Sequence, residues 1–196
     1  MAHRTTEEKQ NPTEDDIRNR LKELSAPMLQ QEYLENLLKR MALQPSIKVF
    51  ASKNLTDLYI KRGLWSSAAR ILENAADAAT AFNEKKSIYM NVGALYIKAM
   101  DYLPADDAFR KAVEAASPGE KAKLTVDIRG IFLREAETLD KDARIAKAVK
   151  LYERILRSAT APDEKKKVMS RLMVLYEKLA RISDSFAMRE ALKNMK

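Results

Sequence analysis

The chain has 196 residues, of which 46% are hydrophobic and 33% are charged, and its formal net charge is +8. It contains no cysteine and one histidine, His3, which excludes disulfide frameworks, thiol nucleophiles, Cys/His zinc sites and Ser-His triads. Its four glycines leave no Gly-rich phosphate loop, so we expect neither a cofactor nor a metal ion.

The N-terminal segment is polar. Residues 1–12 show no apolar periodicity and end in Pro12, which predicts a mobile tail. They contain no apolar core of a signal peptide, and no later run reaches the roughly 18 apolar residues of a membrane span. The absence of cysteine agrees with a reducing compartment. We therefore expect a soluble, cytoplasmic protein.

Helical periodicity begins at Thr13, which we expect to be a helix N-cap because three acidic residues follow it. Residues 13–45 are predicted to form a helical pair that caps the fold, and residues 46–196 to form helical repeats. No segment alternates with the two-residue period of a strand. Corners between the helical segments are expected at Pro27, Pro45, Gly63, Asn83, Pro104, Pro118, Asp140, Pro162 and Ser183.

An internal repeat follows from comparing these segments. One window aligns with the next at a shift of 37 residues, pairing Leu55, Tyr59, Gly63, Trp65, Ala68, Leu72 and Ala75 with Val92, Tyr96, Met100, Tyr102, Ala105, Phe109 and Ala112. Small residues let two antiparallel helices approach, and large residues fill the space beside them. Two later windows are degenerate. In the first of these windows, Ala148, Tyr152 and Ile155 lie about six residues later in the sequence than direct counting of the repeat predicts. The second window continues from Tyr176 to Ser183, Ala187 and Ala191.

The window from Tyr89 to Pro118 resembles the tetratricopeptide repeat (TPR) family. It carries the family signature at Tyr89, Val92-Gly93, Tyr96, Ala105, Phe109, Ala112 and Pro118. The resemblance implies an all-α fold, an α-α superhelix of stacked antiparallel helical hairpins, with about nine or ten helices in this chain. It also implies a concave groove, lined by the first helix of each repeat, that binds a segment of another protein.

The resemblance places seven polar residues in this groove: Lys53, Asn54, Asn91, Lys98, Arg134, Lys167 and Arg171. Family members that bind a C-terminal carboxylate use Lys, Arg and Asn in such positions. Asp57 stands where those members have Asn and would repel a carboxylate, and the pair Lys167 and Arg171 lies one repeat too late. Solvated surface charge is therefore the competing interpretation.

Positive charge is concentrated near the C-terminus, where residues 141–196 hold 15 Lys and Arg against 7 Asp and Glu. The segment from Lys141 to Arg157 is amphipathic, with a basic ridge opposite its apolar face, formed by Lys147, Lys150, Arg154 and Arg157. An outer helix that packs its apolar side on neighbours explains this pattern without a ligand. Alternatively, the ridge attracts an acidic protein, RNA or an anionic membrane.

Two functions from different classes remain open. The first is a non-enzymatic adaptor or scaffold that binds a protein or peptide partner in the groove, with an acidic partner among the candidates. The alternative is RNA binding through the basic surface of residues 141–196, although the few aromatic residues leave no evident stacking platform for bases. The carboxylate pairs, such as Asp106 with Asp107, are explained as solvated helix faces, and no feature indicates an enzyme.

Overall fold

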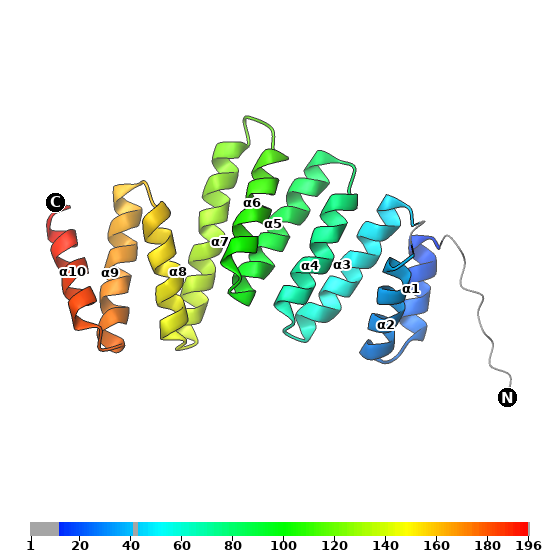
Figure 1. Ribbon diagram of the computed structural model, residues 1–196, viewed down its shortest axis with the longest axis horizontal. Coiled ribbons are helices and arrows are strands. Elements are labelled where there is room, and N and C mark those ends of the chain that lie inside the picture. Colours follow the sequence, from blue (N-terminus) through cyan, green and yellow to red (C-terminus); the bar gives the residue numbers. More distant parts are fainter. Residues whose placement is uncertain (1–11, 41–42, 196) are drawn as a thin grey trace. The chain divides into compact units, whose positions relative to one another are not determined.

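The structure is a computed structural model that describes residues 12–40 and 43–195. Within these ranges all regular secondary structure is helical, and the helices follow one another in antiparallel order (Figure 1). The predicted all-α class of antiparallel helical hairpins is confirmed. His3 and residues 1–11 of the predicted tail lie outside the described residues. The part of the chain that the structure describes forms ten helices: α1 (Glu14–Glu23), α2 (Pro27–Leu38), α3 (Pro45–Lys61), α4 (Trp65–Ala78), α5 (Phe82–Ala99), α6 (Tyr102–Glu114), α7 (Lys121–Lys141), α8 (Ile145–Ser158), α9 (Pro162–Lys178) and α10 (Ile182–Lys193).

The chain divides into two compact units, residues 1–121 and 122–196. In the first unit, each helix from α2 to α5 packs against the next along the chain. In the second unit, α9 packs against both α8 and α10. The boundary between the two units falls inside residues 46–196, which the sequence predicts to be a single region of helical repeats. We refer to the four helical pairs α3/α4, α5/α6, α7/α8 and α9/α10 as hairpins 1 to 4.

The first helix starts where the sequence predicts. The Thr13 hydroxyl oxygen accepts from the Asp16 backbone N–H at 3.2 Å, and the Asp16 carboxylate accepts from the Thr13 backbone N–H at 2.9 Å. These two reciprocal hydrogen bonds pair backbone N–H groups that have no acceptor within the helix. Pro12, the last residue of the predicted tail, is buried.

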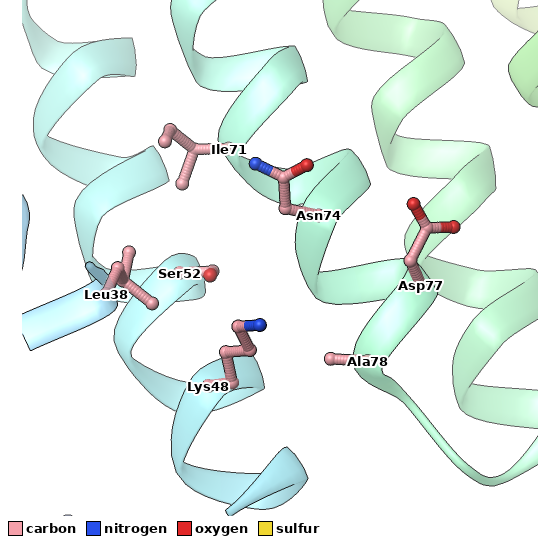
Figure 2. A pocket seen from close by; sticks show the side chains of 7 residues that line it. All are labelled: Leu38, Lys48, Ser52, Ile71, Asn74, Asp77 and Ala78. Carbon is pink, nitrogen blue, oxygen red and sulfur yellow. The ribbon is translucent and has the colours of Figure 1, made fainter. Parts of the chain in front are cut away.

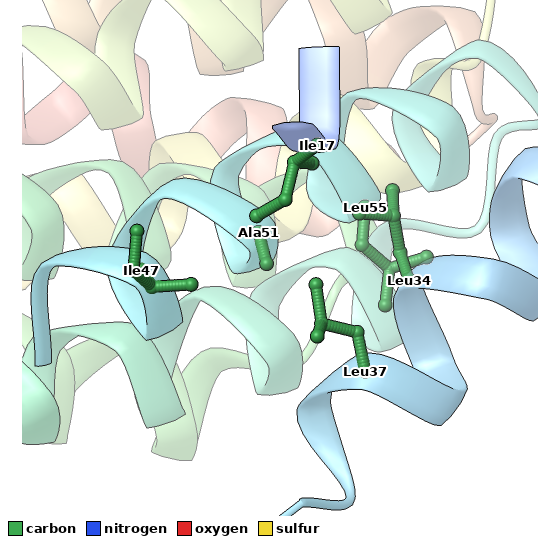
Figure 3. Close-up of a cluster of buried hydrophobic side chains, with 6 residues drawn as sticks. All are labelled: Ile17, Leu34, Leu37, Ile47, Ala51 and Leu55. Atoms are coloured by element: carbon green, nitrogen blue, oxygen red, sulfur yellow. The ribbon is translucent and has the colours of Figure 1, made fainter. Parts of the chain in front are cut away.

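The N-terminal helices share one hydrophobic core with hairpin 1. Its buried side chains come from α1, α2 and α3 (Figure 3), and they are Ile17, Leu34, Leu37, Ile47, Ala51 and Leu55. Because α3 also contacts α4, α1 and α2 cover the side of α3 that would otherwise expose these residues.

The turn inside each hairpin has the same backbone geometry. One residue adopts the left-handed conformation, and the next residue's N–H donates to the carbonyl five positions before it, at 2.8–2.9 Å. The left-handed residues are Gly63 (φ 70°), Met100 (φ 66°), Ala143 (φ 56°) and Ala180 (φ 56°).

The spacing of these turns confirms the repeat. Gly63 and Met100 lie 37 residues apart, as do Ala143 and Ala180, whereas Met100 and Ala143 lie 43 apart. The six additional residues match the predicted delay. They are accommodated by α7, which has 21 residues against 17 in α3, and by the connection before it.

Two details of the predicted register are wrong. Asp140 is not a corner, because α7 continues to Lys141 and the chain turns at Ala143. In hairpin 4, the turn at Ala180 puts Ser185, and not Ala187, at the position of the small packed residue. Ser185 is buried and Ala187 is exposed. Both errors arise where the apolar pattern is weak, so that turn geometry decides the register.

Close packing explains the smallest residue of hairpin 2. A Cβ atom added to Gly93 on α5 would lie 2.4 Å from Cε1 of Phe109 on α6. The aromatic ring therefore occupies the volume that a side chain at position 93 would need.

Candidate functional site

A groove lies between α3 and α5 in the first unit, with Leu72 of α4 at its base. Its volume is about 590 Å3. The apolar lining includes Leu72, Ile88 and Leu95, which are all buried. The polar side chains that line it are Lys53, Thr56, Asp57, Glu84, Ser87, Asn91 and Lys98.

Three of the predicted groove residues meet here. Lys53 comes from α3, whereas Asn91 and Lys98 come from α5, and all three are exposed. Asn54 does not line the groove: its Nδ2 donates to the backbone carbonyl of Phe50 at 2.9 Å, and the side chain is half-buried. One position along a helix rotates a side chain by 100°, which explains why Asn54 faces another direction than Lys53.

Both lysines of the groove have partners. The Lys53 Nζ lies 3.0 Å from a Glu84 carboxylate oxygen across the groove, and the Lys98 Nζ lies 4.8 Å from the ring centroid of Trp65. The exposed ion pair contributes little to stability, so a ligand can displace it at small cost. With Asp57 added, the groove holds two cations and two anions, and a lone carboxylate gains no net attraction from it.

The second unit contains an equivalent groove between α7 and α9, with a volume of about 530 Å3. The turns of hairpins 3 and 4 follow those of hairpins 1 and 2 by 80 residues, and the groove residues follow the same shift. Thus Tyr152 replaces Leu72 at the base, and Arg171 replaces Asn91. The predicted pair Lys167 and Arg171 lines this groove, as the i, i+4 spacing on α9 requires.

Carboxylates, two of which (Glu137 and Asp140) the sequence assigned to a solvated helix face, balance these cations. The Arg171 guanidinium pairs with Asp140, while Glu137 and Glu164 also line the groove. Arg134 is exposed on α7 and is not part of this lining. Lys167 and Arg171 therefore share a groove with each other but not with Lys53 and Asn91, which lie in the groove of the first unit.

The predicted basic ridge is present on α8, with one difference. Lys147, Lys150 and Arg157 are exposed, whereas Arg154 is half-buried and its guanidinium carbon lies 5.6 Å from the ring centroid of Phe132. The apolar face that the sequence placed opposite the ridge is buried at Ala148, Val149, Tyr152 and Ile155.

Tyrosines link successive helical pairs. The hydroxyl groups of Tyr59, Tyr96 and Tyr176 donate to Glu35, Glu73 and Glu153 at 2.7, 3.2 and 2.8 Å. Burial, together with the neighbouring carboxylate, raises the pKa of each of these tyrosines to about 12. Each link joins the second helix of one pair to the first helix of the next, so we assign these shifts to packing between helices.

In residues 12–40 and 43–195, no cluster of His, Cys, Asp or Glu side chains is arranged to hold a metal ion. None of the helices within the same ranges combines the length and the apolar content needed to cross a bilayer.

Comparisons with known proteins leave the family open. No protein-family model matches the chain, and no curated protein matches its sequence. Among solved structures, the chain is similar to the crystal structure of BtubC (BKLC) from P. vanneervenii, with a TM-score of 0.40 and 14% sequence identity. The alignment covers 92% of this chain and 78% of that chain.

Proposed function

We propose that this protein is a non-enzymatic, cytoplasmic adaptor of the TPR-like class that binds an extended segment of a partner protein in the groove between α3 and α5. The observation that carries the proposal is the groove itself, with a buried apolar base and polar side chains from two helices along its rim. Ligand sites commonly combine an apolar base with a few placed polar groups. The resemblance of residues 89–118 to the TPR signature supports the same assignment.

Recognition would combine three contacts. The exposed amide of Asn91 offers a donor and an acceptor to the backbone of an extended peptide. An apolar side chain of the peptide would pack over Leu72 and Ile88. Lys98 and Asp57 would select residues of opposite charge on either side, because like charges at an interface are disfavoured.

The test begins with cross-linking and mass spectrometry on the tagged full chain, which identifies a partner and the residues it touches. The purified partner is then titrated calorimetrically against the triple variant Lys53→Ala, Asn91→Ala, Lys98→Ala. We expect a loss of affinity of about tenfold or more, or about 1.4 kcal/mol. The control variant Lys147→Ala, Lys150→Ala, Arg157→Ala removes the same number of exposed polar groups and should bind normally. Equal binding by parent and groove variant would remove the groove from the proposal.

A second candidate function, RNA binding, is favoured by the charge of the second unit. Residues 122–196 hold 18 Lys and Arg against 11 Asp and Glu, and Lys147, Lys150 and Arg157 of α8 are exposed. Such binding weakens steeply as salt increases. Reversing these three charges to Glu should abolish a gel shift of single-stranded RNA, whereas Lys53→Glu with Lys98→Glu should not. Absence of any shift at ~50 mM salt with the parent chain would eliminate this function.

A further inference from the structure

A second cavity of the first unit shares no lining residue with the groove. It is lined by side chains of α2, α3 and α4, and its volume is about 400 Å3. Leu38 and Ile71 lie on one side of the opening and Asp77 and Ala78 on the other (Figure 2). The side chains between them are Ser52, Asn74 and Lys48.

The repeat indicates what this space holds elsewhere in the protein. The shift of 37 residues places Tyr89 and Lys111 of hairpin 2 at the positions of Ser52 and Asn74. Tyr89 is 5% exposed, and the Lys111 Nζ lies 5.5 Å from its ring centroid. In hairpin 2, therefore, an aromatic ring from the first helix is packed beneath a cation from the second helix.

Hairpin 3 repeats this arrangement. The shift of 80 residues places Phe132 and Arg154 at the same two positions, and Arg154 lies 5.6 Å from the ring centroid of Phe132. In hairpin 4, the buried side chain of Met169 occupies the ring position. Hairpin 1 alone among the four has a small polar residue, Ser52, at the ring position. It has Asn74 in place of the cation that hairpins 2 and 3 have on their second helix. The cavity coincides with these two replacements.

We propose that this cavity binds an aromatic side chain of a partner protein, a tyrosine or phenylalanine with an acidic residue next to it. The ring would occupy the volume that Tyr89 and Phe132 fill in the following hairpins. The Ser52 hydroxyl and the Asn74 amide offer hydrogen bonds to a phenolic hydroxyl. Such a site lies outside the groove, so the proposal does not depend on peptide binding there.

Lys48 explains the preference for an acidic neighbour. It lies one turn before Ser52 on α3 and is partly exposed. Among the described residues, no carboxylate lies within ion-pair distance of its ammonium group. Asp77, on the far side of the opening, accepts a hydrogen bond from the Tyr89 hydroxyl at 2.5 Å. Lys48 therefore remains available to pair with an anion and to contact the ring face.

Entry of a ring requires small movements. Ser52 is only 1% exposed and forms the floor, while Asn74 is exposed and Lys48 half-exposed above it. Both upper side chains are flexible and reach solvent, so they can rotate aside. A single ring buries so little area that it can bind only weakly by itself, in the millimolar range, which is why we assign it to a protein and not to a free metabolite.

The first experiment follows backbone amide resonances of the isotope-labelled full chain by NMR while small probes are added at millimolar concentration. The probes are p-cresol, 4-hydroxyphenylacetate and the non-aromatic control cyclohexanol. We expect saturable shifts at Lys48, Ser52, Asn74 and Ala78 with both aromatic probes. The carboxylate probe should bind several-fold more tightly, and Lys48→Ala should remove that difference. An equal response to cyclohexanol, or no saturable shift at these amides, would overturn the proposal.

The second experiment fills the cavity. The double variant Ser52→Tyr, Asn74→Lys copies the Tyr89–Lys111 pair of hairpin 2, and should raise the melting temperature and abolish probe binding. Ser52→Ala is the matched control that keeps the cavity and the binding. If the double variant does not fold, the Lys48→Ala comparison still decides.

The third experiment tests the source of the ring. Acetyl-Glu-Tyr-Glu-amide should bind more tightly than p-cresol and should bind at the same amides, whereas acetyl-Glu-Leu-Glu-amide should not bind. Binding of the small aromatic acid without binding of the tyrosine peptide would overturn the assignment to a partner protein.

Discussion

Three residues at hairpin turns adopt a backbone conformation that suits glycine. Met100, Ala143 and Ala180 have φ between 56° and 66°, in the left-handed region, where a Cβ atom crowds the backbone. Only Gly63 occupies the fourth such position without this strain. The hydrogen bond that closes each turn holds the other three in place.

We predict that Ala143→Gly and Ala180→Gly each stabilise the fold by roughly 0.5–1 kcal/mol, because glycine removes the strain but adds entropy to the unfolded chain. Gly63→Ala should destabilise by a similar amount. Nothing lies within 4 Å of a Cβ added there, so the effect reports the backbone alone. Urea denaturation midpoints measure all three variants, and a loss of stability in Ala143→Gly would contradict the strain argument.

A second prediction concerns Gly93. Gly93→Ala should destabilise by about 1–3 kcal/mol, despite the higher helix propensity of alanine, because its Cβ would overlap the Phe109 ring. Adding Phe109→Leu should restore part of the loss, since Leu72 holds the equivalent position in hairpin 1. Thermal unfolding of the two variants is the measurement. If the second substitution only adds to the first, the steric explanation is wrong.

At the level of elements, three tyrosine–glutamate hydrogen bonds connect successive helical pairs. They join α2 to α3, α4 to α5 and α8 to α9. Because each folded-state pKa, about 12, lies above the usual value near 10, folding favours the protonated phenol. The resulting stabilisation is complete below about pH 10 and is lost as the pH rises through about 12.

Tyr96→Phe tests this link. At neutral pH we expect a loss of about 1 kcal/mol, typical of one intramolecular hydrogen bond. The difference between parent and variant should then shrink between pH 10 and 12, because the parent tyrosine must give up its proton as it unfolds. Denaturant titrations at several pH values measure both effects, with Leu103→Ala, at an exposed position of α6, as a control that should show no such pH dependence. A constant difference would exclude the hydrogen bond as its origin.

At the scale of the whole molecule, the chain has two separately packed units with different charge. The first is nearly neutral, with 18 basic and 17 acidic residues, whereas the second has 18 basic and 11 acidic residues. In repeat architectures, each element is stabilised mainly by its neighbours, so damage to one core has regional effects.

Leu34→Ala should show this regional behaviour. Leu34 is fully buried in the core that α1 and α2 share with α3 (Figure 3), and its truncation should cost about 2–5 kcal/mol locally. Native-state hydrogen exchange should lose protection in α1 to α4 while α8 to α10 keep theirs. The exposed Leu29→Ala in the same helix supplies the reference variant. Uniform loss of protection would show that the chain opens as a single unit.

Local interactions explain what the sequence could predict. Helix periodicity, the Thr13 cap and the 37-residue spacing depend on residues a few positions apart, and these predictions are confirmed. Lys53, Asn91 and Lys98 line one groove, whereas Asn54, the repeat equivalent of Asn91, faces elsewhere, because α3 and α5 turn different faces toward the groove between them.

Contacts between helices required the tertiary structure. The pairing of Arg171 with Asp140 spans 31 residues, and the cavity at Ser52 is lined by side chains of three helices, α2, α3 and α4. The helices and their period follow from interactions between residues a few positions apart, so the amino-acid sequence alone predicts them. Which charges neutralise one another and where space remains depend on distances between helices, which no local pattern encodes.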